Sequence, residues 1–199
     1  MFIKANSMQT LINRLTIFSL VAASFTVGCN NEQQKPEESK EVAEDQNDAK
    51  FKADSAEHNA QFVVDAANGN LTEIRMAELA QQKSSNKEVK EIAKMLQDDH
   101  TAALNDLKVL AGNKSISIPA DVTDDTKQQL QKLTDEKPAS FDKEWTDKLM
   151  DKHQKTISDY EAALGTVTDQ DIKNWINTVL PKIRSHHDKL MALNSRLKK

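Results

Sequence analysis

The fold is decided by residues 85–112, SNKEVKEIAKMLQDDHTAALNDLKVLAG. Apolar side chains recur there every three or four residues, which is the spacing of one face of an α-helix. These side chains belong to Val89, Ile92, Ala93, Leu96, Ala103, Leu104, Leu107 and Ala111. Ser85 and Glu88 have the spacing of a capping box at a helix start, and Gly112 is typical of a helix end. The segment therefore predicts one long amphipathic helix that packs against other helices.

Three other segments have the same helical periodicity. They are residues 55–83, 140–164 and 168–197. Aromatic residues make up only 5% of the chain, and Gly and Pro number four each, so the composition favours helices over strands. We therefore predict an all-α fold, with four long helices in a domain at residues 55–199.

A long connection separates the second and third predicted helices. It covers residues 112–139, contains Pro119 and Pro138, and has a short helical pattern at residues 124–133. Two helical hairpins joined by one long crossover have the connectivity of ferritin-like bundles, whereas short loops throughout are typical of up-and-down bundles. We therefore expect a ferritin-like four-helix bundle.

The N-terminal residues 1–28 have the pattern of a signal peptide. Lys4 and Arg14 make the start basic, and the apolar run LTIFSLVAASFTV follows at residues 15–27. This run is shorter than the roughly 20 residues that a helix needs to cross a membrane, and a polar segment follows it at once. We expect export and removal of the leader rather than a permanent transmembrane anchor.

Cys29 is the one cysteine of the chain, so it cannot form an internal disulfide. The stretch Thr26-Val-Gly-Cys29 resembles the lipobox of bacterial lipoproteins. This resemblance implies acyl chains on Cys29, and two or three such chains anchor a protein stably to a membrane. Asn30 is not the Asp that resembles an inner-membrane retention signal, which favours the outer membrane. Thr26 stands where the lipobox prefers Leu, so the alternative is cleavage by the ordinary signal peptidase and release of a secreted protein.

Residues 29–54 are polar and charged after the cysteine. Val42 and Phe51 are the only sizeable apolar side chains among them, too few to form a core. We therefore predict that this segment is a flexible tether between the membrane and the bundle.

The charge of the chain argues against a nucleic-acid partner. The formal net charge is -4, and removal of the basic leader would make it more negative. Acidic and basic residues are interleaved along the predicted helices, which is typical of a solvated surface.

Four polar residues fall on the apolar faces of the predicted helices, one on each helix. They are Glu73, His100, His153 and His186. A rise of 1.5 Å per residue from the hairpin turns places all four near the middle of the bundle. Three imidazoles and a carboxylate can hold one divalent ion, such as Zn²⁺ or Fe²⁺. The alternative is a polar core cluster, in which the histidines are satisfied by hydrogen bonds to one another, to Tyr160 or Glu73, or to a buried water.

Any metal site built from these residues is expected to be mononuclear. A ferritin-type di-iron centre has Glu-x-x-His on two helices, but the residues three before the histidines are Gln97, Met150 and Ile183. Asp98 and Asp151 each lie two residues before a histidine. Because residues two apart do not share a helical face, we expect both to point to solvent.

Part of the sequence resembles a known family. The phrase VKEIAKMLQDDH at residues 89–100, Phe141-Asp142 with His153, and Leu180-Pro181 with His186 are similar to uncharacterised bacterial proteins described as predicted outer-membrane proteins. The similarity covers roughly residues 55–197. It implies a ferritin-like helical fold and a location in the cell envelope, and it implies no activity.

The sequence has no nucleophile elbow, P-loop, dinucleotide-binding fingerprint or pair of catalytic carboxylates. We therefore expect a membrane-anchored envelope lipoprotein without catalytic residues, whose bundle binds an envelope protein or has a structural or stress-related role. The alternative function is the binding of a single divalent metal ion by Glu73, His100, His153 and His186. A third function, the carriage of a lipid or another hydrophobic ligand, would need a sizeable apolar cavity.

Overall fold

Residues 38–198 are described by the computed structural model, and they form six α-helices with no β-strand among them. The helices are α1 (Ser39–Lys50), α2 (Asp54–Lys83), α3 (Lys87–Asn113), α4 (Asp124–Asp135), α5 (Pro138–Thr166) and α6 (Gln170–Leu197). The predicted all-α class is therefore confirmed for this part of the chain. The predicted signal peptide and Cys29 lie outside the described residues.

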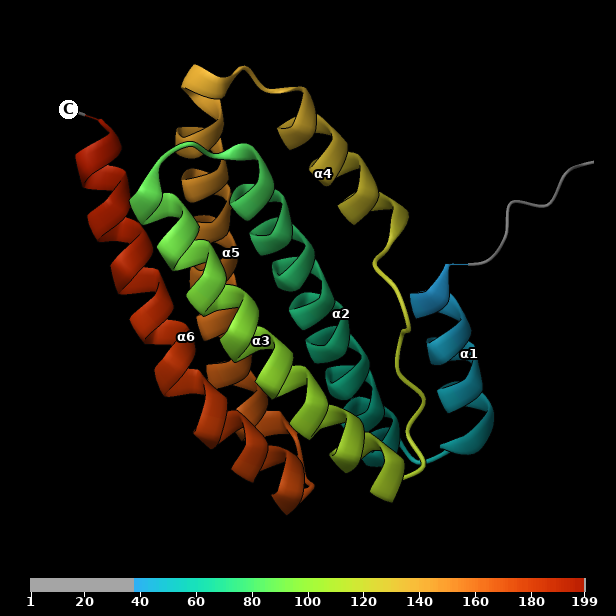
Figure 1. Ribbon diagram of the computed structural model, residues 1–199. Helices are drawn as coiled ribbons and strands as arrows, with labels where there is room; N and C mark the ends of the chain where they lie inside the picture. The colour runs from blue at the N-terminus through green and yellow to red at the C-terminus, as the bar shows by residue number, and fades with distance from the viewer. Residues whose placement is uncertain (1–37, 199) are drawn as a thin grey trace, which may run out of the picture. The chain divides into compact units, whose positions relative to one another are not determined.

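Four long helices pack into a bundle (Figure 1). α2 and α3 form one hairpin, and α5 and α6 form the other. The hairpins meet where α3 packs on α6 and where α2 packs on α5. The crossover between α3 and α5 carries α4, which lies against α2 and α5. The two hairpins are thus joined by one long connection.

Apolar side chains fill the bundle in two clusters along its length. One cluster contains Trp175 and the other contains Trp145, and burial of such side chains is the main force that holds the helices together. Each indole N–H donates to a carbonyl of another helix, Trp145 to Met76 at 2.9 Å and Trp175 to Ala103 at 3.2 Å. Between the two clusters, each long helix contributes buried polar residues. This polar layer contains the candidate site.

Side-chain caps set the starts of α3 and α6. Oδ1 of Asn86 accepts the backbone N–H groups of Glu88 at 2.9 Å and of Val89 at 3.4 Å. The predicted cap at Ser85 is therefore wrong by one residue, because the amide oxygen of Asn86 reaches two free N–H groups of the first turn. Asp169 caps α6 in the same way, so this helix begins slightly later than its predicted start.

The helix α1 corrects the prediction of a flexible tether for residues 38–54, the part of the predicted segment 29–54 that the structure describes. Residues 39–50 are helical and pack beside α2 and the crossover (Figure 1). The buried side chain of Asn47 donates to the carbonyl of Ser117 at 2.8 Å and accepts the N–H of the same residue at 2.8 Å. The crossover thus supplies hydrogen-bond partners that a segment with few apolar side chains needs in order to dock.

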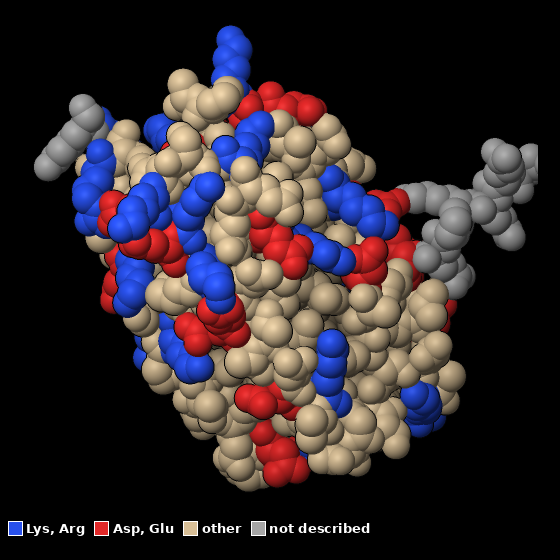
Figure 2. Space-filling view, viewed as in Figure 1, with Lys and Arg blue, Asp and Glu red and all other residues tan. Residues whose placement is uncertain are grey.

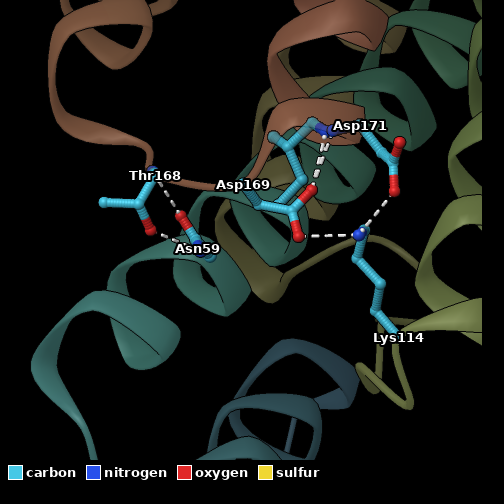
Figure 3. A network of polar contacts seen from close by, with 6 residues as sticks. Asn59, Lys114, Thr168, Asp169 and Asp171 are labelled. Atoms are coloured by element: carbon cyan, nitrogen blue, oxygen red, sulfur yellow. Dashed lines mark hydrogen bonds and ion pairs between the residues drawn. The ribbon is translucent and has the colours of Figure 1, made fainter.

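Polar side chains connect the helix ends at one end of the bundle (Figure 3). Asn59 of α2 donates to Oγ1 of Thr168 at 3.1 Å and accepts the N–H of that residue at 3.0 Å. Lys114, which follows α3, forms ion pairs with Asp169 at 2.6 Å and Asp171 at 2.8 Å. Asp169 also caps α6, so its carboxylate joins the end of α3 to the start of α6. We call these five residues the end network.

Charged side chains of both signs are intermixed on the face that Figure 2 shows. Ion pairs between residues four apart on one helix are part of this pattern, as in Lys94–Asp98 at 2.5 Å and Lys155–Asp159 at 2.6 Å. Over residues 38–198, no helix combines the length and the apolar character that a membrane span requires.

Candidate metal centre

Three histidines meet in the middle of the bundle, one each from α3, α5 and α6. The ring centroids of His100, His153 and His186 lie 5.4 to 5.6 Å apart, so the rings form a nearly equilateral triangle. The three residues are 4%, 1% and 2% exposed. We call them the histidine triad. Asp98 and Asp151 are exposed, as predicted, and lie outside it.

The ring of His100 is held by Asn70 of α2. Its Nδ1 lies 2.9 Å from Oδ1 of Asn70. The amide of Asn70 has a fixed orientation, because its Nδ2 donates to the carbonyl of Ala66 at 2.8 Å. The amide oxygen therefore faces the ring, and Nδ1 of His100 carries the proton in this hydrogen bond.

The other two rings are held in the same way. Nδ1 of His153 donates to the carbonyl of Leu149 at 2.9 Å, and Nε2 of His186 donates to Oδ2 of Asp99 at 2.9 Å. Burial alone would raise the pKa of Asp99, but hydrogen bonds from His186 and Lys182 outweigh it and lower the pKa below its usual value. Asp99 is therefore a charged acceptor for His186.

Each histidine is left with one ring nitrogen that has no hydrogen-bond partner among the described residues. These nitrogens are Nε2 of His100, Nε2 of His153 and Nδ1 of His186. In a neutral imidazole one nitrogen carries the proton and the other a lone pair, so in the neutral rings these three nitrogens carry the lone pairs. One ring nitrogen from each histidine lies within 4.8 Å of those from the other two. Tetrahedral Zn²⁺ with Zn–N bonds of 2.0 to 2.1 Å holds its nitrogens about 3.3 Å apart, so modest side-chain shifts would let all three bind one ion.

The triad does not form a closed hydrogen-bonded cluster. The three free nitrogens are all acceptors, and no protein group in the described part of the chain donates to them. One water molecule has two protons, so it satisfies at most two of the three lone pairs. Proton uptake by His100 and by His186 is disfavoured as well, because burial lowers the pKa of His100 well below its usual value and also lowers the pKa of His186. A single metal ion would satisfy all three nitrogens.

A model of the family DUF4142, a domain of unknown function, matches residues 43–193. The chain belongs to this family. The match begins inside α1, so the DUF4142 domain includes part of the segment that the sequence predicted to be a tether. It also covers all three histidines of the triad.

The fold of this DUF4142 domain is also similar to a solved structure. The crystal structure of a DUF305 fragment from Deinococcus radiodurans matches with a TM-score of 0.62 and 10% sequence identity, over 70% of this chain and 96% of that chain. At this identity the similarity shows a shared helical fold alone. No curated protein matches the sequence.

Glu73 lies beside the triad of the DUF4142 domain and not within it. Its Oε1 is 3.8 Å from Nδ1 of His153, the nitrogen that already donates to Leu149. Burial raises the pKa of this carboxyl, against the opposing effect of His153 and Lys152. The structure therefore does not bring the predicted fourth ligand into the group whose donor atoms converge.

Sequence reasoning missed Asn70 and Asp99, the two side chains that hold the triad. Asn70 lies three residues before Glu73 and so shares its helical face, which was an available signal. Asp99 is not on the apolar face of α3, and its partner His186 belongs to another helix. Only the three-dimensional register of α3 against α6 reveals that contact.

Proposed function

We propose that this domain binds one divalent transition-metal ion, with Zn²⁺ as the preferred ion, through His100, His153 and His186. The observation that carries the proposal is the arrangement of the ring nitrogens. Each ring donates one N–H to a fixed acceptor outside the triad and leaves the other nitrogen free. Metal-binding histidines have this arrangement, because the outer hydrogen bond fixes the tautomer and the direction of the lone pair.

The donor set favours Zn²⁺ in a site with an open position. Imidazole nitrogens suit Zn²⁺, and three histidines leave the fourth tetrahedral position for a water or another ligand. The connectivity of the bundle supports a place among ferritin-like folds, but the donors differ from the carboxylate-rich di-iron set of ferritin-type centres. Iron oxidation at a two-metal centre is therefore not part of the proposal.

The experiment is a measurement of bound metal on the full chain. After dialysis against Zn²⁺ and removal of free ion, elemental analysis should give about one Zn²⁺ per chain. A His100→Ala, His153→Ala double variant should retain almost none. His58→Ala is the matched control, because His58 is an exposed histidine of α2, and it should retain the full amount. Absence of zinc from the natural chain, or equal zinc in the double variant, would overturn the proposal.

We also propose that the domain is held at a bacterial membrane, the outer membrane by preference, by acyl chains on Cys29. The support is the sequence: a basic and apolar leader, a lipobox-like stretch and a cysteine that has no partner for an internal disulfide. Labelled palmitate should be incorporated into the natural chain in bacterial cells and not into Cys29→Ser. Label on the variant would contradict the anchor.

A further inference from the structure

We propose that the cavity beside the histidine triad is the route by which a hydrated divalent cation enters and leaves the triad. This inference rests on the proposed metal site and adds how the ion reaches it. The cavity lies among α2, α5 and the start of α4, and its volume is about 560 Å³. His100, a buried residue of the triad, forms part of its wall, so the cavity leads from the surface to one of the three ligands.

The buried polar atoms of the wall that have no hydrogen-bond partner among the described residues are all acceptors. They are Nε2 of His100, Oε2 of Glu73 and Oδ1 of Asn68. His100 and Glu73 are only 4% and 6% exposed, so leaving their acceptors without a donor is costly. A carboxyl keeps an acceptor oxygen whether or not it is protonated, so Glu73 accepts a hydrogen bond in either form. The wall therefore needs donors, which an incoming species has to supply.

A hydrated cation supplies these donors. The water molecules around a divalent ion point their protons outward, and the charge of the ion makes them stronger donors. Asn68 and Glu73 can accept hydrogen bonds from these waters along the wall, and the lone pair of His100 can replace one of them as the first ligand. A carboxylate or phosphate would bring further acceptors and does not fit the same wall.

The charged residues of the wall also favour a cation over an anion. Four acidic residues outnumber two lysines there, and the six residues are Asp65, Glu73, Asp125 and Asp159 against Lys152 and Lys155. A cavity lined mainly by one sign of charge attracts ions of the opposite sign and raises their local concentration. An anion would meet an excess of like charge.

Ion pairs cancel part of this excess but leave one carboxylate at the rim unpaired. Asp159 pairs with Lys155 at 2.6 Å. Asp65 pairs at 2.8 Å with Lys40, which lies outside the wall. Of the remaining charges, Lys152 acts on the buried Glu73. The exposed Asp125 accepts a hydrogen bond from the neutral amide of Gln129 at 2.6 Å, so its negative charge stays available to an approaching ion.

A glycine at the mouth of the cavity supports the same conclusion. Gly69 lies in the middle of α2, where glycine destabilises a helix by about 1 kcal/mol relative to alanine. No crowding explains it, because a Cβ added there would meet no atom within 4 Å. Gly69 is exposed and lines the cavity, so the missing side chain leaves room for an ion to pass.

A second cavity also touches His100 but is too small for a hydrated ion. It lies between α3 and α6, and its volume of about 40 Å³ has room for about three water molecules. Lys182 lines it and places a positive charge 3.1 Å from Asp99. A divalent ion that keeps a first shell of about six waters needs more space. The larger cavity is therefore the route.

The test measures how fast the metal-free full chain takes up Co²⁺, whose visible absorption reports its ligands. Gly69→Leu should slow uptake about tenfold and should slow release to a chelator equally, because a narrowed route changes both rates and leaves the dissociation constant unchanged. Ala102→Leu is the matched control, because Ala102 is an exposed small residue of α3 that lines the second cavity. This variant should take up Co²⁺ as fast as the natural chain.

The outcomes separate the route from the metal site. If no bands of bound Co²⁺ form in the natural chain, the metal site itself is wrong. If the bands form and Gly69→Leu takes up the ion as fast as the natural chain, the metal site stands and the route is wrong. Slow uptake in Ala102→Leu alone would place the route at the second cavity and overturn the proposal.

Two further comparisons test the wall. Glu73→Leu removes the acceptor and should slow uptake about tenfold, whereas Glu73→Gln keeps an amide oxygen and should recover most of the rate. Asp125→Asn should slow uptake about threefold at low salt and not at high salt. Asp106→Asn should have no effect, because Asp106 is an exposed acid that lines only the second cavity. Natural rates in both Glu73→Leu and Asp125→Asn would overturn the proposal.

Discussion

The end network and the histidine triad are both groups of polar residues that connect helices of the bundle. The residues of the end network form ion pairs and hydrogen bonds with one another, whereas the residues of the triad do not. In the end network, Lys114 pairs with two carboxylates, and Asn59 and Thr168 exchange two hydrogen bonds. In the triad, each ring has one satisfied nitrogen and one free nitrogen. The end network lies near solvent, whereas the triad is almost fully buried.

The difference separates a structural role from a binding role. Exposed polar groups that close their own hydrogen bonds add modest stability and need nothing else. Buried acceptor nitrogens that have no donor reduce the stability of the metal-free fold, and a bound cation removes this penalty. The two regions should therefore respond in opposite ways to metal and to mutation.

The largest expected effect is stabilisation by Zn²⁺. An ion that binds only the folded chain stabilises it by about 4 kcal/mol when its free concentration is a thousand times Kd. We expect this increase in the natural chain and in Lys114→Ala, and we expect none in His153→Ala. Urea unfolding with and without saturating Zn²⁺ measures the free energies. An equal increase in His153→Ala would mean that the ion binds elsewhere.

Removal of the side chains that hold the triad should have the next largest effect. Loss of an outer hydrogen bond to a metal-binding histidine typically weakens metal affinity by about 10- to 100-fold. Asp99→Ala and Asn70→Ala should each show a loss of this size in a competition titration with a zinc chelator. Asp98→Ala is the control, because Asp98 is the exposed neighbour of Asp99 and should bind Zn²⁺ normally. Full affinity in Asp99→Ala would remove the role assigned to its carboxylate.

The metal-free chain should lose stability as the pH falls below about 6.5. Burial lowers the pKa of folded His100 below the value of about 6.5 for an unfolded histidine, so the unfolded chain binds the proton first. At pH 5 this one group destabilises the fold by at most about 2 kcal/mol. Urea unfolding at pH 7 and pH 5 in the presence of a chelator should show a smaller loss for His100→Gln. The same loss in both chains would argue against the buried neutral imidazole.

The smallest expected effect belongs to the end network. Asp169→Ala removes the N-cap of α6 and one ion pair of Lys114, which should lower the free energy of unfolding by about 1 kcal/mol. Zinc affinity should not change, because the end network lies at the end of the bundle and the triad at its middle. A tenfold loss of zinc affinity in this variant would show that the two regions are coupled.

Helical periodicity was sufficient to predict the four long helices and the convergence of the histidines. A histidine in an apolar series, such as His100 between Leu96 and Leu104, must be buried wherever the series is buried. Periodicity places a residue on a face but does not give its depth against a partner helix. For this reason Glu73 is predicted as a ligand from the sequence. In the structure its carboxylate instead lies 3.8 Å from Nδ1 of His153, the nitrogen that donates to Leu149.

The parts that the sequence did not reveal depend on contacts between distant segments. Asn47 in α1 docks through the backbone of Ser117, and any sequence can offer a backbone group. Asp99 holds His186 across two helices. Neither contact produces a periodic pattern in the sequence of one helix. Both could therefore be identified only from the three-dimensional structure.

The origin of the triad from three helices and both hairpins determines when the ion can be captured. In the unfolded chain the imidazoles are dozens of residues apart, so each meets a metal ion almost as an isolated ligand of low effective concentration. Useful affinity arises only when both hairpins have docked. If the proposed leader threads the chain through a membrane unfolded, the protein arrives without metal. The ion it holds would then come from the compartment in which it folds, and its occupancy would report the metal supply there.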